Sequence, residues 1–197
     1  MRACAALLLA IAWSANAEVV CALGSNAALY KAASDQRPTS DALQLATRVN
    51  SALKSICADH CPTLALFRNP TAANIMVMAE HGDGKLVYSP QFLSMVYDGF
   101  GDDGIVALIA HEIGHALDAT LGAKFIRDSW APELRADAWA GCVLANINAG
   151  ASGLQSSLAA LQKYPPASAT PWPARAPALR TGYTQCGGAA ANFDRRK

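Results

Sequence analysis

Hydrophobic and polar residues follow two periods along this chain, one typical of helices and the other typical of strands. The first helical pattern begins at Pro38-Thr39-Ser40-Asp41, a helix-start signal, and its apolar positions recur at helical spacing as far as Ile56. Short apolar runs then predict strands at Thr63 to Phe67, Ile75 to Met78 and Lys85 to Tyr88. The segment from His81 to Gly84 is typical of a hairpin connection between the last two strands.

The second half of the chain has mainly helical spacing. Gly99 to Gly104 interrupts this spacing and predicts a loop, in which Asp102 or Asp103 is placed to cap the next helix. Around this loop, helices are predicted at Gln91 to Tyr97, Ile105 to Leu121, Pro132 to Asn148 and Leu154 to Tyr164. Five prolines between Pro165 and Pro177 predict an extended surface segment and not a helix. Helices and strands in this order predict an α+β fold.

The first residues have the three parts of a secretory signal peptide: Arg2, the apolar run from Ala3 to Trp13, and the cleavage signal Ala15-Asn16-Ala17. We therefore expect residues 1–17 to be removed on export, to the periplasm or to the outside of the cell. Residues 18–197 are then one domain, with a proline-rich segment from about residue 165. No run in this mature chain is long enough for a transmembrane helix, which takes about 20 apolar residues.

Five cysteines remain in the mature chain, and an exported protein meets an oxidising compartment in which disulfides form. Cys57 and Cys61 are one helical turn apart, and here a local disulfide is favoured over a second metal site. Cys142 and Cys186 would then tie the C-terminal part to the domain, while Cys21 could exchange with either pair. Because five is an odd number, we expect at least one thiol to stay free or to pair between molecules.

The strongest chemical signal is the run His111-Glu112-Ile113-Gly114-His115 within the predicted helix. His111 and His115 are four residues apart and share a helix face, where two imidazoles can bind one zinc ion. Glu112 is placed to take a proton from a zinc-activated water and to pass it to a leaving amine. Gly114 weakens the helix, which is consistent with the close approach of another backbone or of a substrate.

A catalytic zinc site requires a third protein ligand in addition to the two histidines. A three-histidine arrangement is excluded, because Asp118 and Leu121 stand where that pattern needs Gly and His. Glu133 on the next predicted helix can complete a site of two histidines and one glutamate, which leaves a fourth position for water. Asp137, four residues further, can accept the outer N–H of a ligand histidine. Arg175 or Tyr183 is a candidate for stabilising an oxyanion.

The segments HEIGHALD and ELRADAWAG resemble the zinc peptidases of the gluzincin clan, nearest the heat-shock protease HtpX and CAAX prenyl protease type. Those enzymes pair H-E-x-x-H with a later E-x-x-A-D. The resemblance implies a zincin-like minimal metallopeptidase domain, with the active-site helix and the glutamate helix packed on a small sheet or hairpin. It also implies that the zinc ligands are His111, His115 and Glu133, that Glu112 is the catalytic acid and base, and that Arg175 matches an arginine of the family.

We therefore expect a zinc-dependent endopeptidase, with one Zn²⁺ per chain, that hydrolyses peptide bonds of exported proteins. Its partners would be protein or peptide substrates, since a formal net charge of +1 gives no basic surface for nucleic acid or an anionic membrane. Two rivals remain: a non-proteolytic zinc-binding or chaperone-like protein of the same fold, and a cell-wall peptide amidase. The sequence does not predict the oligomeric state.

Two segments could contact the substrate. Peptidases of this type bind an extended substrate as an added strand, and Val77-Met78-Ala79 or Lys85-Leu86-Val87 could either accept that strand or be ordinary sheet. The proline-rich segment could cover the cleft as a latch, in which case truncation after Tyr164 should raise the activity.

Overall fold

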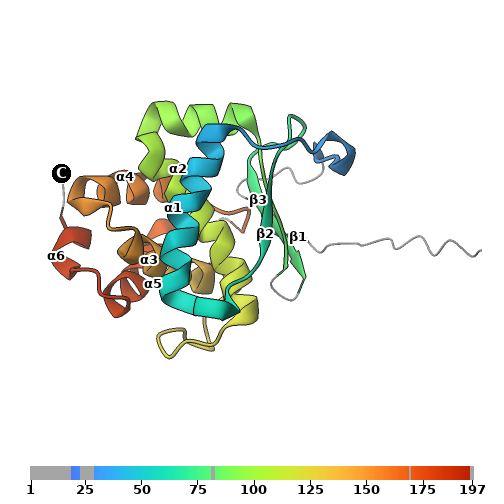
Figure 1. Cartoon of the computed structure of the whole chain (residues 1–197). Helices are drawn as coiled ribbons and strands as arrows, with labels where there is room; N and C mark the ends of the chain where they lie inside the picture. The colour runs from blue at the N-terminus through green and yellow to red at the C-terminus, as the bar shows by residue number, and fades with distance from the viewer. Residues whose placement is uncertain (1–18, 23–28, 81–82, 169, 196–197) are drawn as a thin grey trace, which may run out of the picture.

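The computed structural model describes residues 19–22, 29–80, 83–168 and 170–195, so the predicted signal peptide and residues 81–82 of the hairpin connection lie outside the described residues. Figure 1 shows a small sheet on one side of the molecule and the helices gathered on the other. This arrangement confirms the predicted α+β class. Within the described ranges, no helix combines the length and the apolar character needed to cross a membrane.

The sheet has four strands in the order β1-β3-β4-β2. Their bounds are β1 Val19–Ala22, β2 Leu64–Arg68, β3 Ile75–Glu80 and β4 Asp83–Tyr88. β3 pairs antiparallel with β1 and β4, whereas β2 runs parallel to β4. The three predicted strands are confirmed, and β1 is an additional strand that the hydrophobic pattern does not indicate.

β3 and β4 are both central strands. β1 pairs with β3 over Met76 to Met78, and β2 pairs with β4 over its whole length. The expectation that Val77-Met78-Ala79 or Lys85-Leu86-Val87 accepts an added substrate strand is therefore wrong, and the alternative of ordinary sheet is confirmed. The central position of β3 also explains its sequence pattern. Because the strand is buried on both faces, its residues form a continuous apolar run and do not alternate with polar ones.

The helices lie close to their predicted positions. α1 spans Ser40–Cys57, and the Thr39 hydroxyl oxygen accepts a hydrogen bond from the Ala42 N–H at its start. The other bounds are α2 Pro90–Thr120, α3 Pro132–Ile147, α4 Gly150–Lys163, α5 Trp172–Gln185 and α6 Ala190–Phe193, with 3-10 turns η2 Ala32–Ser34 and η3 Ala58–His60.

A kink in α2 replaces the loop predicted at Gly99 to Gly104. Gly101 alone leaves the helical conformation, with φ 64° and ψ −164°, a backbone geometry that glycine adopts without a steric penalty. The predicted loop is wrong because one glycine is enough to redirect the helix. Asp103, a candidate cap in the prediction, instead forms an ion pair with Arg48 of α1 at 2.9 Å.

The predicted extended segment is wrong from Trp172 onward, where α5 begins. Pro173 lies in the first turn, where a backbone N–H would have no helical partner, so only Pro177 removes a hydrogen bond from the helix interior. Burial offsets that cost, since Leu179 is fully buried. Because α5 packs into the core against α3, the segment is not a surface latch, and truncation after Tyr164 would remove part of the core.

Glycines and a disulfide hold α5 close to α3. A Cβ atom at Gly141 of α3 would collide with the Leu179 carbonyl oxygen, and one at Gly182 of α5 would collide with the Ala138 carbonyl oxygen. Next to this contact, Cys142 and Cys186 form a disulfide with their Cα atoms 5.1 Å apart. The predicted pairing is confirmed, and it fixes the position of α5 on α3.

The second predicted disulfide, Cys57–Cys61, is also present, with its Cα atoms 4.9 Å apart. It joins the last residue of α1 to the residue that follows η3. Since both sulfur atoms are in the disulfide, neither is available to a metal ion, which agrees with the preference for a bridge over a second metal site.

Candidate metal centre

The second half of α2 carries His111, Glu112 and His115. The helix is apolar around them, so all three side chains are buried, with exposed fractions of 0 %, 0 % and 4 %. Such groups require polar or metal partners, because burying them without partners costs several kcal/mol, roughly 2–7 for a neutral polar group. The four-residue spacing places the two imidazole rings next to each other, with their centroids 5.1 Å apart.

The third candidate ligand comes from the first turn of α3. Glu133 Oε2 lies 3.2 Å from His111 Nε2 and 3.5 Å from His115 Nε2. Atoms bound to zinc at 2.0–2.1 Å in a tetrahedron are separated by about 3.3–3.4 Å, so these separations fit one small metal ion. The two histidines and Glu133 therefore form a group that could hold a metal ion.

A glycine explains how α3 approaches α2 so closely. A Cβ atom at Gly114, between the two histidines, would collide with the backbone oxygen of Ala136 on α3. The absence of a side chain there lets the first turns of α3 lie against the ligand face of α2. The expectation that Gly114 allows a close backbone approach is thus confirmed, and the backbone is that of the helix that carries Glu133.

Asp137 orients the first histidine. Its Oδ1 lies 2.9 Å from His111 Nδ1, and both side chains are fully buried. A carboxylate at Nδ1 favours the tautomer with the proton on that nitrogen, which leaves Nε2 with a lone pair for a metal ion. Both Nε2 atoms, of His111 and His115, are buried and make no proper hydrogen bond within the described residues. This combination fits a metal site better than an ordinary buried hydrogen-bond network.

Arg175 of α5 holds Asp137 from the other side. Its Nε and Nη2 donate to the two Asp137 carboxylate oxygens at 2.8 and 2.7 Å, and its Nη1 donates to the Leu161 carbonyl oxygen at 2.9 Å. The guanidinium is 1 % exposed. This placement does not favour the expected oxyanion role, which needs an N–H group directed at the substrate. Instead, Arg175 supports the carboxylate that orients His111.

The charges of the centre shift the pKa values of its groups. Burial by itself lowers the pKa of His111, but Asp137, with Glu133 and Glu112 nearby, outweighs burial and raises it to about 9. Burial lowers the pKa of His115 more than Glu133 raises it. Burial also raises the pKa of Glu133, but the two facing histidine rings more than reverse this effect and hold it well below its usual range. Glu133 is therefore an ionised carboxylate, as a metal ligand must be.

Glu112 faces the sheet. Its Oε2 accepts a hydrogen bond from the Val77 N–H of β3 at 3.0 Å. This contact fixes one carboxylate oxygen of the expected acid and base against a central strand. The sequence did not predict it, because nothing in the local pattern shows which backbone N–H of a strand will meet a helix 35 residues later.

Comparisons with protein-family models, with curated protein sequences and with solved structures found no match for this chain. What the described residues establish is a buried group of two histidines and a glutamate that could hold a metal ion, with a buried glutamate beside it and an arginine–aspartate pair behind it.

Proposed function

We propose that this protein is a zinc-dependent endopeptidase that acts on exported proteins and is related in its centre to the gluzincin peptidases. One observation carries the proposal: His111 Nε2, His115 Nε2 and Glu133 Oε2 converge at distances that fit a single metal ion, immediately beside the buried carboxylate of Glu112. A site that only binds metal has no use for that additional carboxylate.

The donor set supports zinc as the metal. Two imidazole nitrogens and one carboxylate oxygen are the ligands of known catalytic zinc sites, in which three protein ligands leave a further position for water or substrate. A structural zinc site is instead closed by four protein ligands, usually including cysteines. In this protein, four of the described cysteines are held in disulfides.

The chain's own residues would then have separate roles in the reaction. A bound zinc ion supplies acidity to water and polarises the carbonyl of the scissile bond. Glu112, held at Oε2 by the Val77 N–H, takes the proton from the attacking water and delivers it to the leaving amine. Asp137 keeps the proton of His111 on Nδ1, and Arg175 keeps Asp137 in place.

Export supports the choice of substrate class. Two disulfides are compatible with an oxidising compartment, and residues 1–17 have the pattern of a signal peptide. A peptidase outside the cytoplasm meets proteins that are themselves exported, and unfolded chains are the most accessible of these.

The test is cleavage of unfolded casein by the purified, zinc-loaded protein, followed by mass spectrometry. Glu112→Gln should retain one zinc per chain and lose activity by about a hundredfold or more, the contribution of a positioned acid and base. A chelator should abolish the activity of the unsubstituted protein, and added zinc should restore it. Asp98→Asn, an exposed change on α2, is the control and should leave cleavage unaltered.

The same assay separates the two rivals. Zinc binding without cleavage of casein or of cell-wall peptides by the unsubstituted protein would identify a non-proteolytic zinc-binding protein. Cleavage of cell-wall peptides alone would identify an amidase. Casein cleavage that survives in Glu112→Gln would remove Glu112 from the mechanism.

A further inference from the structure

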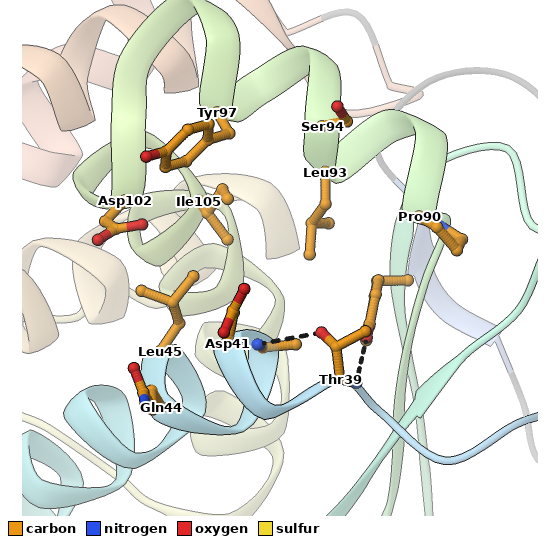
Figure 2. Close-up of a pocket in the computed structure, with 12 residues that line it drawn as sticks. Thr39, Asp41, Gln44, Leu45, Pro90, Leu93, Ser94, Tyr97, Asp102 and Ile105 are labelled. Carbon is orange, nitrogen blue, oxygen red and sulfur yellow. Dashed lines mark hydrogen bonds between the residues drawn. The ribbon is translucent and has the colours of Figure 1, made fainter.

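A cavity of about 430 Å³ lies between the start of α1 and the first part of α2. Its apolar wall includes Leu45, Leu93 and Ile105, and Tyr97, which is 56 % exposed, also lines it. Figure 2 shows Leu93 and Ile105 extending from α2 into the space above α1. No residue of the candidate metal centre lines this cavity, so it is a separate feature.

The charged residues of the cavity are both acidic. Asp41 comes from the first turn of α1 and Asp102 follows the kink in α2. Figure 2 shows the Asp41 carboxylate directed into the space between the two helices. Within the described residues, the Asp102 side chain has neither a hydrogen bond nor an ion pair, and the Asp41 side chain has only a 3.3 Å hydrogen bond from the neighbouring Ser40 hydroxyl. Among the residues that the structure describes, no lysine or arginine lines the cavity, so its negative charge is not balanced by them.

The walls of the cavity are held in position. Beside it, Arg48 of α1 and Asp103 of α2 form an ion pair at 2.9 Å that joins the two helices. At the other end, the Tyr88 hydroxyl accepts a hydrogen bond from the Thr39 N–H, which ties the start of α1 to β4. Asp102 directly follows Gly101, the residue at which α2 changes direction.

We propose that this cavity binds a lysine or arginine side chain of an extended polypeptide. The aliphatic part of such a side chain packs against Leu45, Leu93 and Ile105, as long basic side chains do on apolar surfaces. Its cationic end reaches Asp41 and Asp102, and the face of the Tyr97 ring attracts the same charge. A cavity lined by apolar side chains, two carboxylates and an aromatic ring complements the apolar stem and the charge of these two side chains.

Binding of one side chain will be weak, because both carboxylates are exposed and exposed ion pairs contribute little. A dissociation constant of about 1 mM is therefore expected for a short probe peptide. Such a contact becomes effective when the same polypeptide is held at a second place, since the second binding event is then intramolecular. The proposal itself does not depend on the metal centre and is tested without an activity assay.

The probe is acetyl-Leu-Arg-amide, titrated into the purified, disulfide-bonded, ¹⁵N-labelled protein while backbone amide signals are followed by NMR. Saturable shifts are expected at Asp41, Tyr97 and Asp102. Acetyl-Leu-citrulline-amide has nearly the same shape without the charge and should bind at least fivefold more weakly. This comparison uses the unsubstituted protein, so it does not depend on whether any variant folds.

Two variants then test whether Asp41 and Asp102 supply the negative charge that binds the probe. D41N/D102N should weaken binding of the arginine probe at least fivefold, whereas Asp98→Asn, an exposed acidic residue on α2 that does not line the cavity, should change it less than twofold. Circular dichroism checks that both variants keep the fold. Equal binding of the citrulline probe, shifts confined to another surface, or an equal effect of Asp98→Asn would each overturn the proposal.

Discussion

Arg175 and Asp137 form an ion pair with hydrogen bonds of 2.7 and 2.8 Å, and their side chains are 1 % and 0 % exposed. Because Asp137 also faces His111 Nδ1, this pair connects α5 to the ligand helix α2 through α3. The late proline-rich part of the sequence therefore supports the candidate metal centre.

Replacing Arg175 with leucine should destabilise the protein strongly. The change leaves Asp137 as a buried charge without its cationic partner, so the free energy of unfolding should fall by about 3–5 kcal/mol. Urea denaturation measures this difference. Arg180→Leu is the matched control, because the Arg180–Asp194 ion pair is exposed and its loss should leave the unfolding transition unchanged. Equal losses in the two variants would contradict the role given to Arg175.

Asp137→Asn should weaken metal binding. Asparagine has nearly the same size but no charge, so His111 loses the carboxylate that fixes its tautomer, and affinity for zinc should fall by about 10–100-fold. Competition with a chromophoric chelator measures the affinity. Asp118→Asn is the control, since Asp118 pairs with Arg135 at 2.7 Å and should have no effect on zinc binding.

Gly114→Ala should separate α2 from α3. Alanine favours the helix by about 1 kcal/mol, but the added methyl group meets the Ala136 backbone, which cannot yield as a flexible side chain would. Overpacking of about 1–3 kcal/mol should dominate, so thermal stability and zinc affinity should both fall. Gly122→Ala, where a Cβ atom meets nothing within 4 Å, should be tolerated. Retained zinc affinity in Gly114→Ala would show that the helix spacing is not critical.

The two disulfides should differ in their contribution to stability. Cys142 and Cys186 are 44 residues apart and Cys57 and Cys61 are 4 apart, so the first closes a far longer loop in the unfolded chain. Loop entropy predicts losses of about 4 and about 2 kcal/mol when each pair is replaced by alanines. Calorimetry of the two double variants tests this order. A larger loss for Cys57 and Cys61 would mean that local structure outweighs loop length there.

A half-buried ion pair near the sheet should make stability depend on pH. Asp35 Oδ2 lies 2.6 Å from Lys85 Nζ, and the Asn69 amide donates to Oδ1 at 2.7 Å. Burial raises the pKa of Asp35, but the hydrogen bonds from Lys85 and Asn69 outweigh burial and lower it. The ionised carboxylate therefore stabilises the folded state above about pH 4, and this contribution is lost as the pH falls through the lowered pKa.

Asp35→Asn tests this dependence. The difference in unfolding free energy between the unsubstituted protein and Asp35→Asn should be largest at about pH 6 and should shrink towards pH 3, as measured by urea denaturation. Asp59→Asn, an exposed change in η3, should give a small difference at every pH. A difference for Asp35→Asn that does not vary with pH would mean that the charge of Asp35 does not stabilise the fold.

The residues of the candidate metal centre could be predicted because their pattern is local. His111 and His115 share a helix face by spacing alone, and Glu133 and Asp137 share a face of the next helix in the same way. The packing that joins the two faces could not be predicted in detail, although Gly114 indicated that another backbone could approach the helix closely there. The α+β class followed from periodicity, and the Cys57–Cys61 disulfide followed from spacing and the expected compartment. The Cys142–Cys186 pairing was the one that remained, with Cys21 as an alternative partner.

The errors arose where tertiary contacts override local preference. Pro177 opposes a helix, yet α5 forms because burial against α3 outweighs one lost hydrogen bond. Gly99 to Gly104 has the composition of a loop, but a single positive φ at Gly101 is enough to redirect α2. β1 could not be found because a four-residue strand has too few positions to establish a period.

The contribution of α5 has a consequence for the timing of activity. If the chain is exported with its N-terminus first, as the pattern of residues 1–17 predicts, His111 and Glu112 cross the membrane before Arg175 does. Until α5 has crossed as well, Asp137 lacks its partner and α3 lacks the helix that packs on it. If the proposed function is correct, the order of translocation keeps the peptidase inactive during transit and allows it to become active only on the far side of the membrane.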